Sequence, residues 1–159
     1  MNDMTRNRAA ERHGAPGFTL VELLIVVAII GIISAVALPN LLNAVDKAKQ
    51  KRTMADQRGI CTAIEAYATD NAVYPQNQST WASIKPHLNP HFIREPPDGD
   101  GWNNGWDVAT SATGSDYSLS SFGKDGVLSS RSGGPTTEFD CDIVFSNGGF
   151  TQWPEGTQS

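Results

Sequence analysis

The chain has 159 residues and a formal net charge of −5, and this length favours one domain with at most a small addition. The acidic excess lies in residues 71–159, which carry ten acidic and four basic side chains. This distribution argues against nucleic-acid binding, because nucleic-acid-binding domains present a basic face. The two cysteines, Cys61 and Cys141, are too few for a disulfide framework. They either form one bridge between helix and sheet or remain two buried free thiols, and both options stay open.

Residues 1–17 contain three arginines and one histidine but no apolar run, so we expect a charged leader that does not fold. Residues 18–38 follow as an apolar segment whose only charged side chain is Glu22. The segment is long enough to span a bilayer, which takes about 20 residues. A carboxylate at bilayer depth is costly unless it is paired, so Glu22 indicates a functional position.

Three hypotheses account for the apolar segment. It is a plain transmembrane anchor, or a signal peptide cut after Ala37, where the preceding residues satisfy the small-x-small rule, or a segment that is cut before Phe18 and retained. Glu22 argues against the signal peptide, because a charge would interrupt its apolar region. Cleavage after Gly17 would create an α-amino cation at Phe18, one helical turn from Glu22, and would supply a partner for the carboxylate.

The helical pattern continues beyond the apolar segment. Apolar residues recur at spacings of three and four through residues 41–48 and again through residues 60–68. We predict one helix over residues 18–70, about 80 Å long at the usual rise per residue, with a kink at Pro39 and a second weak point at Gly31. Residues 46–58 are mostly charged, so we expect this stretch to face solvent or partner subunits.

Residues 71–159 have a different pattern, with turn residues between short apolar runs. We predict a short helix over residues 81–88 and a tight hairpin turn at Asn147-Gly148. The expected strands are Trp106 to Thr110, Tyr117 to Phe122, Asp142 to Ser146 and Phe150 to Trp153. Such strands make a small antiparallel sheet of three or four strands, whose apolar face needs the helix stretch at residues 60–68 as its partner. The predicted fold is therefore α+β, with a sheet packed on the distal half of a long helix.

The residues from Gly17 to Leu24, GFTLVELL, resemble the processing motif of type IV prepilins. The resemblance implies that an inner-membrane prepilin peptidase cuts after Gly17 and methylates the new amino terminus at Phe18. It also implies that Glu22 pairs with the amino terminus of a neighbouring subunit in a helical homo-oligomeric filament. Pro39, with Gly31 before it, falls where this family has its helix kink.

The distal half is similar to the major pseudopilins of type II secretion systems. The similarity rests on residues 117–126, YSLSSFGKDG, on residues 140–143, DCDI, and on the Asp-Gly-Trp segment at residues 100–102. It implies a structural subunit of a periplasmic pseudopilus that helps to export folded proteins. The expected partners are the inner-membrane assembly platform, minor pseudopilins and, before assembly, membrane lipid. The chain would cross the inner membrane once, with its carboxy-terminal domain in the periplasm.

The same resemblance implies a calcium site in the loop between the two distal motifs. The expected ligands are the carboxylates of Asp125, Asp140 and Asp142 and the carbonyl oxygen of Phe122. Carboxylate and carbonyl oxygens suit a hard cation, and three aspartates brought together would repel one another without one. The loop over residues 126–139 is longer than the family pattern. The alternative is that these aspartates are ordinary turn and edge residues.

No other motif carries chemistry. His87 and His91 have an H-x3-H spacing, but Pro90 separates them and no cysteine lies nearby, so we expect no zinc site. The chain has no nucleophile elbow, phosphate-binding loop or zinc-protease motif, and we expect no enzyme. Three tryptophans either complete a small core or form an exposed aromatic surface: Trp102, Trp106 and Trp153.

Two rival functions remain open at this point. The first is a type IV pilin of a long surface filament for adhesion or motility, which shares the processing motif. The second is a soluble secreted calcium-dependent binding domain, released by cleavage after Ala37. The proposed organisation is a cleaved leader over residues 1–17, a helix over residues 18–70 and a globular domain over residues 71–159.

Overall fold

The computed structural model describes residues 17–158, so the predicted leader lies outside the described residues apart from Gly17. The chain divides into two compact units, with the boundary between Leu38 and Pro39. A single helix, α1 (Leu20–Asn71), contributes to both units. The prediction of one long helix is confirmed, and its helical assignment continues through Gly31 and Pro39 without a break. The kink at Pro39 stays a prediction.

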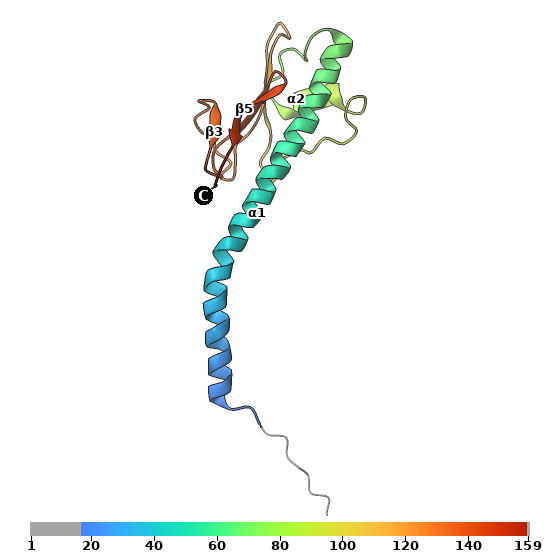
Figure 1. Cartoon of the computed structure of the whole chain (residues 1–159). Helices are drawn as coiled ribbons and strands as arrows, with labels where there is room; N and C mark the ends of the chain where they lie inside the picture. Colours follow the sequence, from blue (N-terminus) through green and yellow to red (C-terminus); the bar gives the residue numbers. More distant parts are fainter. Residues whose placement is uncertain (1–16, 159) are drawn as a thin grey trace, which may run out of the picture. The chain divides into compact units, whose positions relative to one another are not determined.

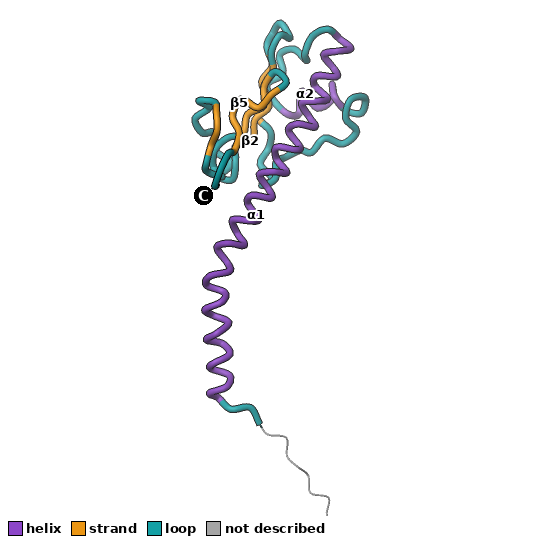
Figure 2. Tube along the Cα trace, in the orientation of Figure 1, coloured by secondary structure: helices purple, strands orange, loops and turns teal. Residues whose placement is uncertain are grey.

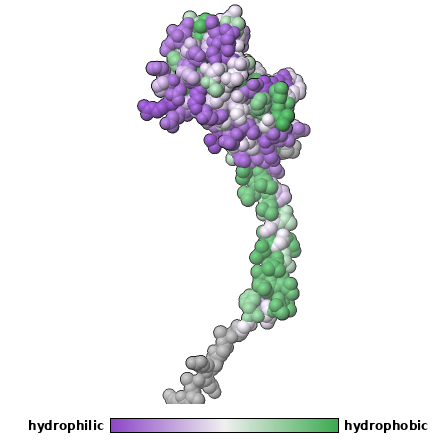
Figure 3. Space-filling model, turned by 180° about the vertical axis from the view of Figure 1, so that it is seen from behind, coloured by the Kyte–Doolittle hydropathy of each residue, from purple (hydrophilic) through white to green (hydrophobic). Residues whose placement is uncertain are grey.

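The described part of the first unit consists mainly of the apolar part of α1, up to Leu38. Its large apolar side chains are exposed along the whole segment, from 43% at Val26 to 81% at Leu20. Figure 3 shows this part of the helix as almost entirely hydrophobic surface. Within the described chain, α1 is the one helix long and apolar enough to cross a membrane. An uncovered apolar helix of this length is unstable in water, so it needs lipid or other helices around it.

The second unit contains a five-stranded sheet with the order β1-β2-β4-β5-β3. Figures 1 and 2 show the sheet beside the last turns of α1. The strands are β1 (Asp107–Thr110), β2 (Tyr117–Ser121), β3 (Gly134–Thr136), β4 (Ile143–Ser146) and β5 (Gly149–Pro154). Four of them are the predicted strands, and the neighbours among these four pair antiparallel. The hairpin between β4 and β5 turns at Asn147 and Gly148, both with positive φ, as a two-residue hairpin turn requires.

The strand β3 was not predicted. It lies in the loop over residues 126–139, which the sequence analysis treated as irregular, and it pairs parallel to β5. Its sequence is Gly-Pro-Thr, which carries none of the alternating apolar pattern by which strands are recognised. The sheet therefore has five strands rather than three or four, and one edge pair is parallel.

The core lies between α1, α2 (Trp81–Leu88) and one face of the sheet. Helix α1 contributes four residues from the predicted stretch, and α2 contributes Ile84 and Leu88. Helix α2 begins where the Thr80 side chain accepts a hydrogen bond from the Ser83 amide. The core residues from α1, from the sheet and from the residue just before β1 are Ile60, Cys61, Ala63, Ile64, Trp106, Val108, Tyr117, Leu119 and Phe145. The predicted partnership between sheet and helix is thus confirmed.

One prediction about α1 was wrong in part: four of the seven charged side chains in residues 46–58 are exposed, as expected, but one face of this stretch is not. A row of polar residues at spacings of four, three and four, here called the polar stripe, is buried within the second unit rather than facing solvent or partner subunits. It consists of Asp46, Gln50, Thr53 and Gln57. Each member bonds to a group of the same domain: the Gln57 amide, for example, donates to the carbonyl oxygens of Leu119 and Ile143 at 3.2 and 2.8 Å. Buried polar groups cost little when hydrogen-bonded, so a polar face can dock a helix as an apolar one does.

Candidate functional site

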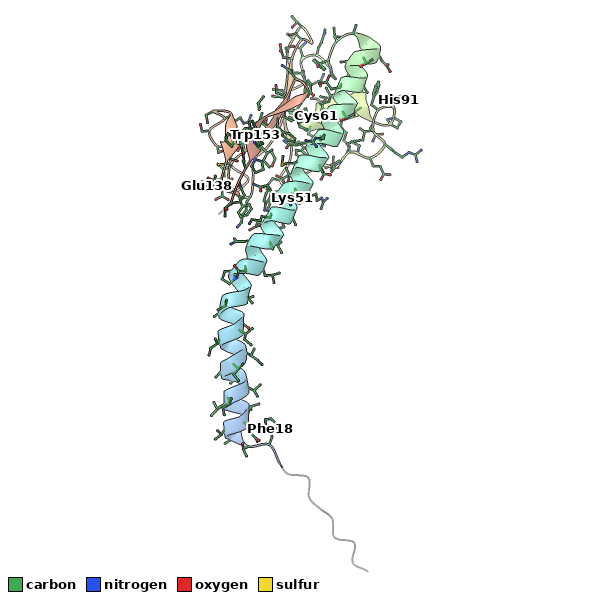
Figure 4. All side chains as sticks on the ribbon, viewed as in Figure 1. Phe18, Lys51, Cys61, His91, Glu138 and Trp153 are labelled. Carbon is green, nitrogen blue, oxygen red and sulfur yellow. The ribbon has the colours of Figure 1, made fainter. Side chains whose placement is uncertain are left out.

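The first candidate site is the start of α1. Residues 17–19 precede the helix in a non-helical segment, and the Phe18 side chain is 76% exposed. Figure 4 shows Phe18 where the chain enters α1. The peptide bond between Gly17 and Phe18 therefore lies in the kind of exposed, non-helical segment that a peptidase can reach. Cleavage and methylation themselves stay predictions.

Glu22 occupies a capping box with Thr19. Its Oε2 accepts hydrogen bonds from the Thr19 amide and from Thr19 Oγ1, both at 2.8 Å. In return, the Glu22 amide donates to Thr19 Oγ1 at 3.2 Å. The reciprocal bonds satisfy amides that the first helical turn leaves without partners. The sequence analysis missed this role, although a threonine three residues before a glutamate, ahead of an apolar run, is its known signature.

The capping box fixes the position of the charge at the helix start. Because Glu22 Oε2 holds the Thr19 amide, the carboxylate lies one residue from the amine that cleavage would create at Phe18. A negative group in the first turn also interacts favourably with the helix dipole. The arrangement can thus present a carboxylate at a fixed height on the helix to a cation from the same or another chain.

The second candidate site is the predicted calcium loop. The two ligand segments do lie together: the Lys124 amide donates to the Phe139 carbonyl oxygen at 2.9 Å. Gly123 has φ +69°, and a Cβ there would lie 2.7 Å from the Asp140 carbonyl oxygen. Only glycine fits this combination of positive φ and close backbone approach, which explains its place in the motif.

The side chains of the predicted ligands do not converge. Asp142 is fully buried, and its Oδ1 accepts from both the amide and the hydroxyl of Ser129 at 3.0 Å. Its Oδ2 accepts from Arg131 Nε at 2.8 Å. Asp125 Oδ1 instead closes a local turn by accepting from the Val127 amide at 3.0 Å. In the described part of the chain, no three His, Cys, Asp or Glu side chains form a group that could hold a metal. With both Asp142 oxygens already bonded, the predicted donor set does not fit a calcium ion.

The cysteines are not bridged. Cys61 and Cys141 are both free in this structure. Cys61 lies in the core on α1 (Figure 4), where burial raises the pKa of its thiol. Cys141 is partly exposed, so the other option, two buried thiols, is right for Cys61 alone.

A third cluster forms around Asp46, the first member of the polar stripe. Its Oδ2 accepts from Lys124 Nζ at 2.9 Å and its Oδ1 from Trp102 Nε1 at 3.2 Å. Burial opposes ionisation of Asp46, but the bonds from Lys124 and Trp102 and the charges of Lys124 and Lys49 outweigh it and lower its pKa. The cluster ties α1 to two segments of the domain that are far apart in sequence.

The Asp-Gly-Trp segment at residues 100–102 packs directly on α1. A Cβ at Gly101 would lie 2.2 Å from the Lys49 carbonyl oxygen, and the Gly101 amide donates to Thr53 Oγ1 at 2.9 Å. Nearby, Trp106 is buried in the core and donates to the Pro97 carbonyl oxygen at 2.8 Å. This segment is therefore a docking element for the helix, and at least Trp106 completes the core rather than forming an exposed surface.

Comparisons with known proteins identify two family descriptions. The prokaryotic N-terminal methylation motif matches residues 12–38, and the family described as type II secretion system (T2SS), protein G, matches residues 40–140. A type II secretion system core protein G from Pseudomonas aeruginosa is 31% identical over 139 residues, which cover 82% of this chain and 95% of the relative. The core protein G of Klebsiella michiganensis is 29% identical over 125 residues, covering 73% of this chain and 88% of the relative. The core protein G of Vibrio cholerae is 31% identical over 119 residues, which cover 69% of this chain and 81% of the relative. No solved structure matches the chain significantly.

Proposed function

The chain belongs to the protein G family of type II secretion systems and is a pseudopilin subunit of such a system. We propose that it polymerises through α1 into a periplasmic pseudopilus that helps to export folded proteins. Its role is structural rather than catalytic. The observation that carries the proposal is the exposed apolar segment of α1 up to Leu38, which lies within the match to the N-terminal methylation motif at residues 12–38.

This apolar surface supplies the free energy of assembly. Before assembly, lipid covers the segment, and the chain waits as a single-pass inner-membrane protein with its second unit in the periplasm. Leaving the bilayer would expose the segment to water at a cost of about 25 cal/mol per Å² of apolar area. Packing against the same segment of neighbouring subunits removes this cost. The helix therefore works both as an anchor and as the core of the filament.

Glu22 provides the register between subunits. After prepilin peptidase cuts after Gly17 and methylates Phe18, the new amine of one subunit pairs with Glu22 of a neighbour. Within one chain, the Glu22 carboxylate is already hydrogen-bonded to the Thr19 amide. We therefore expect the Phe18 amine to pair with the Glu22 carboxylate of a second subunit. A register in which either charge is buried alone is costly.

The proposal implies three kinds of partner besides copies of the same chain. They are the prepilin peptidase, the inner-membrane assembly platform that extracts subunits from the bilayer, and the minor pseudopilins. The second unit, whose charges are mostly acidic beyond residue 71, faces the periplasm and the outside of the filament.

The test is a gene deletion in the source bacterium, with complementation by the intact gene. We expect normally exported enzymes to accumulate in the periplasm of the deletion strain and to return to the medium on complementation, with surface motility unchanged. Normal secretion with lost twitching or adhesion would instead identify a subunit of a surface pilus. If the deletion changes neither secretion nor motility, and the complemented strain releases the domain into the medium, a soluble secreted protein would be favoured.

A further inference from the structure

The proposed function does not use the partly buried Arg131 side chain, which lies in the loop over residues 126–139. The loop over residues 126–139 folds back over the start of β4 and carries Arg131. The Arg131 guanidinium contacts two carboxylates: its Nε lies 2.8 Å from Asp142 Oδ2, and its Nη2 lies 2.8 Å from Asp107 Oδ2. Asp107 begins β1 and Asp142 precedes β4. One side chain from the loop therefore joins two strands that are not neighbours in the sheet.

The environment of Asp142 requires a positive charge. Its side chain has no solvent exposure, and an isolated buried carboxylate is strongly disfavoured unless it is paired and hydrogen-bonded. Arg131 supplies the positive charge, and Ser129, from the same loop, donates two further hydrogen bonds. The Arg131 guanidinium also lies over the Phe122 ring, 5.7 Å from its centroid, an arrangement that favours a planar cation.

A second buried side chain holds the loop beside this pair. The Gln152 amide group donates to the carbonyl oxygens of Asp142 at 2.8 Å and Ser130 at 3.3 Å. Its Oε1 accepts from the Gly133 amide at 3.2 Å. These bonds fix the backbone of the loop between Ser130 and the start of β3. The loop is thus fixed on both sides of Arg131 by groups of the sheet.

We propose that the Arg131 guanidinium is the cation that holds this loop on the sheet, in the role that the resemblance assigns to calcium, and that the fold of this chain does not depend on calcium. A guanidinium presents its donors in a rigid planar fork that contacts two carboxylates at once. A calcium ion at Asp142 would lie beside the Arg131 cation and would compete with Arg131 and Ser129 for the carboxylate oxygens. It would then need several further oxygen ligands, whereas Asp125 is already engaged in its own turn.

The experiment compares thermal unfolding of the full-length chain in detergent with excess calcium and with excess chelator. We expect the melting temperature of the unaltered chain to agree within about 2 °C between the two conditions. Arg131→Gln should lower the melting temperature by at least about 10 °C in both, because it leaves a buried carboxylate without its partner. Arg94→Gln, which removes an exposed arginine from another loop, is the matched control and should change little.

A double variant keeps the test informative if Arg131→Gln does not fold. Asp142→Asn combined with Arg131→Gln removes both charges, so it should recover part of the lost melting temperature. The proposal fails if chelator alone lowers the melting temperature of the unaltered chain and calcium restores it. It also fails if the melting temperature of Arg131→Gln equals that of the Arg94→Gln control. Neither result depends on whether the chain forms a filament.

Discussion

At the scale of single residues, Glu22 has two roles that are separable. Its carboxylate caps the start of α1 through Thr19 in the isolated chain, and it is proposed to meet the Phe18 amine of a neighbour in the filament. Glutamine caps a helix in the same way as glutamate but carries no charge. The Glu22→Gln variant therefore keeps the first role and removes the second.

We expect Glu22→Gln to be cleaved normally but to yield at least about tenfold fewer filaments, because the neighbour's amine loses its counter-charge. Thr19→Val, which removes the hydroxyl of the capping box but keeps the charge, should retain most of the filament yield. Immunoblots would follow leader removal, and quantification of sheared filaments would follow assembly. Normal filament yield from Glu22→Gln would refute the pairing role.

The residue scale also explains why the calcium prediction and the structure diverge. Asp125, Asp140 and Asp142 stand at the positions that the resemblance marks, and their backbone segments do come together. The sequence analysis placed no weight on Arg131, which lies eleven residues before Asp142 in a loop without a motif. Which carboxylate an isolated arginine pairs with depends on how the loop folds, so this contact could not be predicted from spacing.

At the scale of elements, the predictions that succeeded follow strong local patterns. The apolar stripe at residues 60–68, the short helix over residues 81–88 and the Asn147-Gly148 turn are each specified by neighbouring residues. The polar stripe and β3 were missed for the opposite reason. Gln57 is buried because its amide meets carbonyl oxygens of β2 and β4, and β3 exists because β5 offers an edge. Both depend on contacts remote in sequence.

The polar stripe makes the docking of α1 sensitive to acid. Because the pKa of Asp46 is lowered in the folded state, its contribution to stability is present above its unfolded pKa, about 3.9. The contribution is lost as pH falls through the lower folded value. Asparagine at this position cannot titrate, so it removes this part of the acid sensitivity together with the ion pair to Lys124.

We therefore expect Asp46→Asn to lower the melting temperature at pH 7 by about 5 °C, while the fall between pH 7 and pH 3 becomes smaller than in the unaltered chain. The exposed Asp70 on the same helix provides the control: Asp70→Asn should leave both quantities nearly unchanged. Scanning fluorimetry of the full-length chain in detergent measures both. An equal fall with pH in Asp46→Asn and in the unaltered chain would contradict this account of the polar stripe.

At the scale of the whole molecule, two units have opposite surface requirements. In the described residues, the first unit is an apolar helix segment whose large side chains are exposed, and the second is a domain with its own core. A single chain of this kind is stable only when lipid or other copies cover the first unit. This division matches a subunit that waits in a membrane and is then polymerised.

A filament can form through α1 only if the apolar segment is retained after the leader is removed. Mass spectrometry of the mature protein, isolated from membranes of cells that contain prepilin peptidase, measures this directly. We predict an amino terminus at Phe18 that carries one methyl group, with all residues to the end of α1 present. A mature chain that begins at Leu38 would contradict the account, because it would lack both Glu22 and the helix through which the filament is proposed to form.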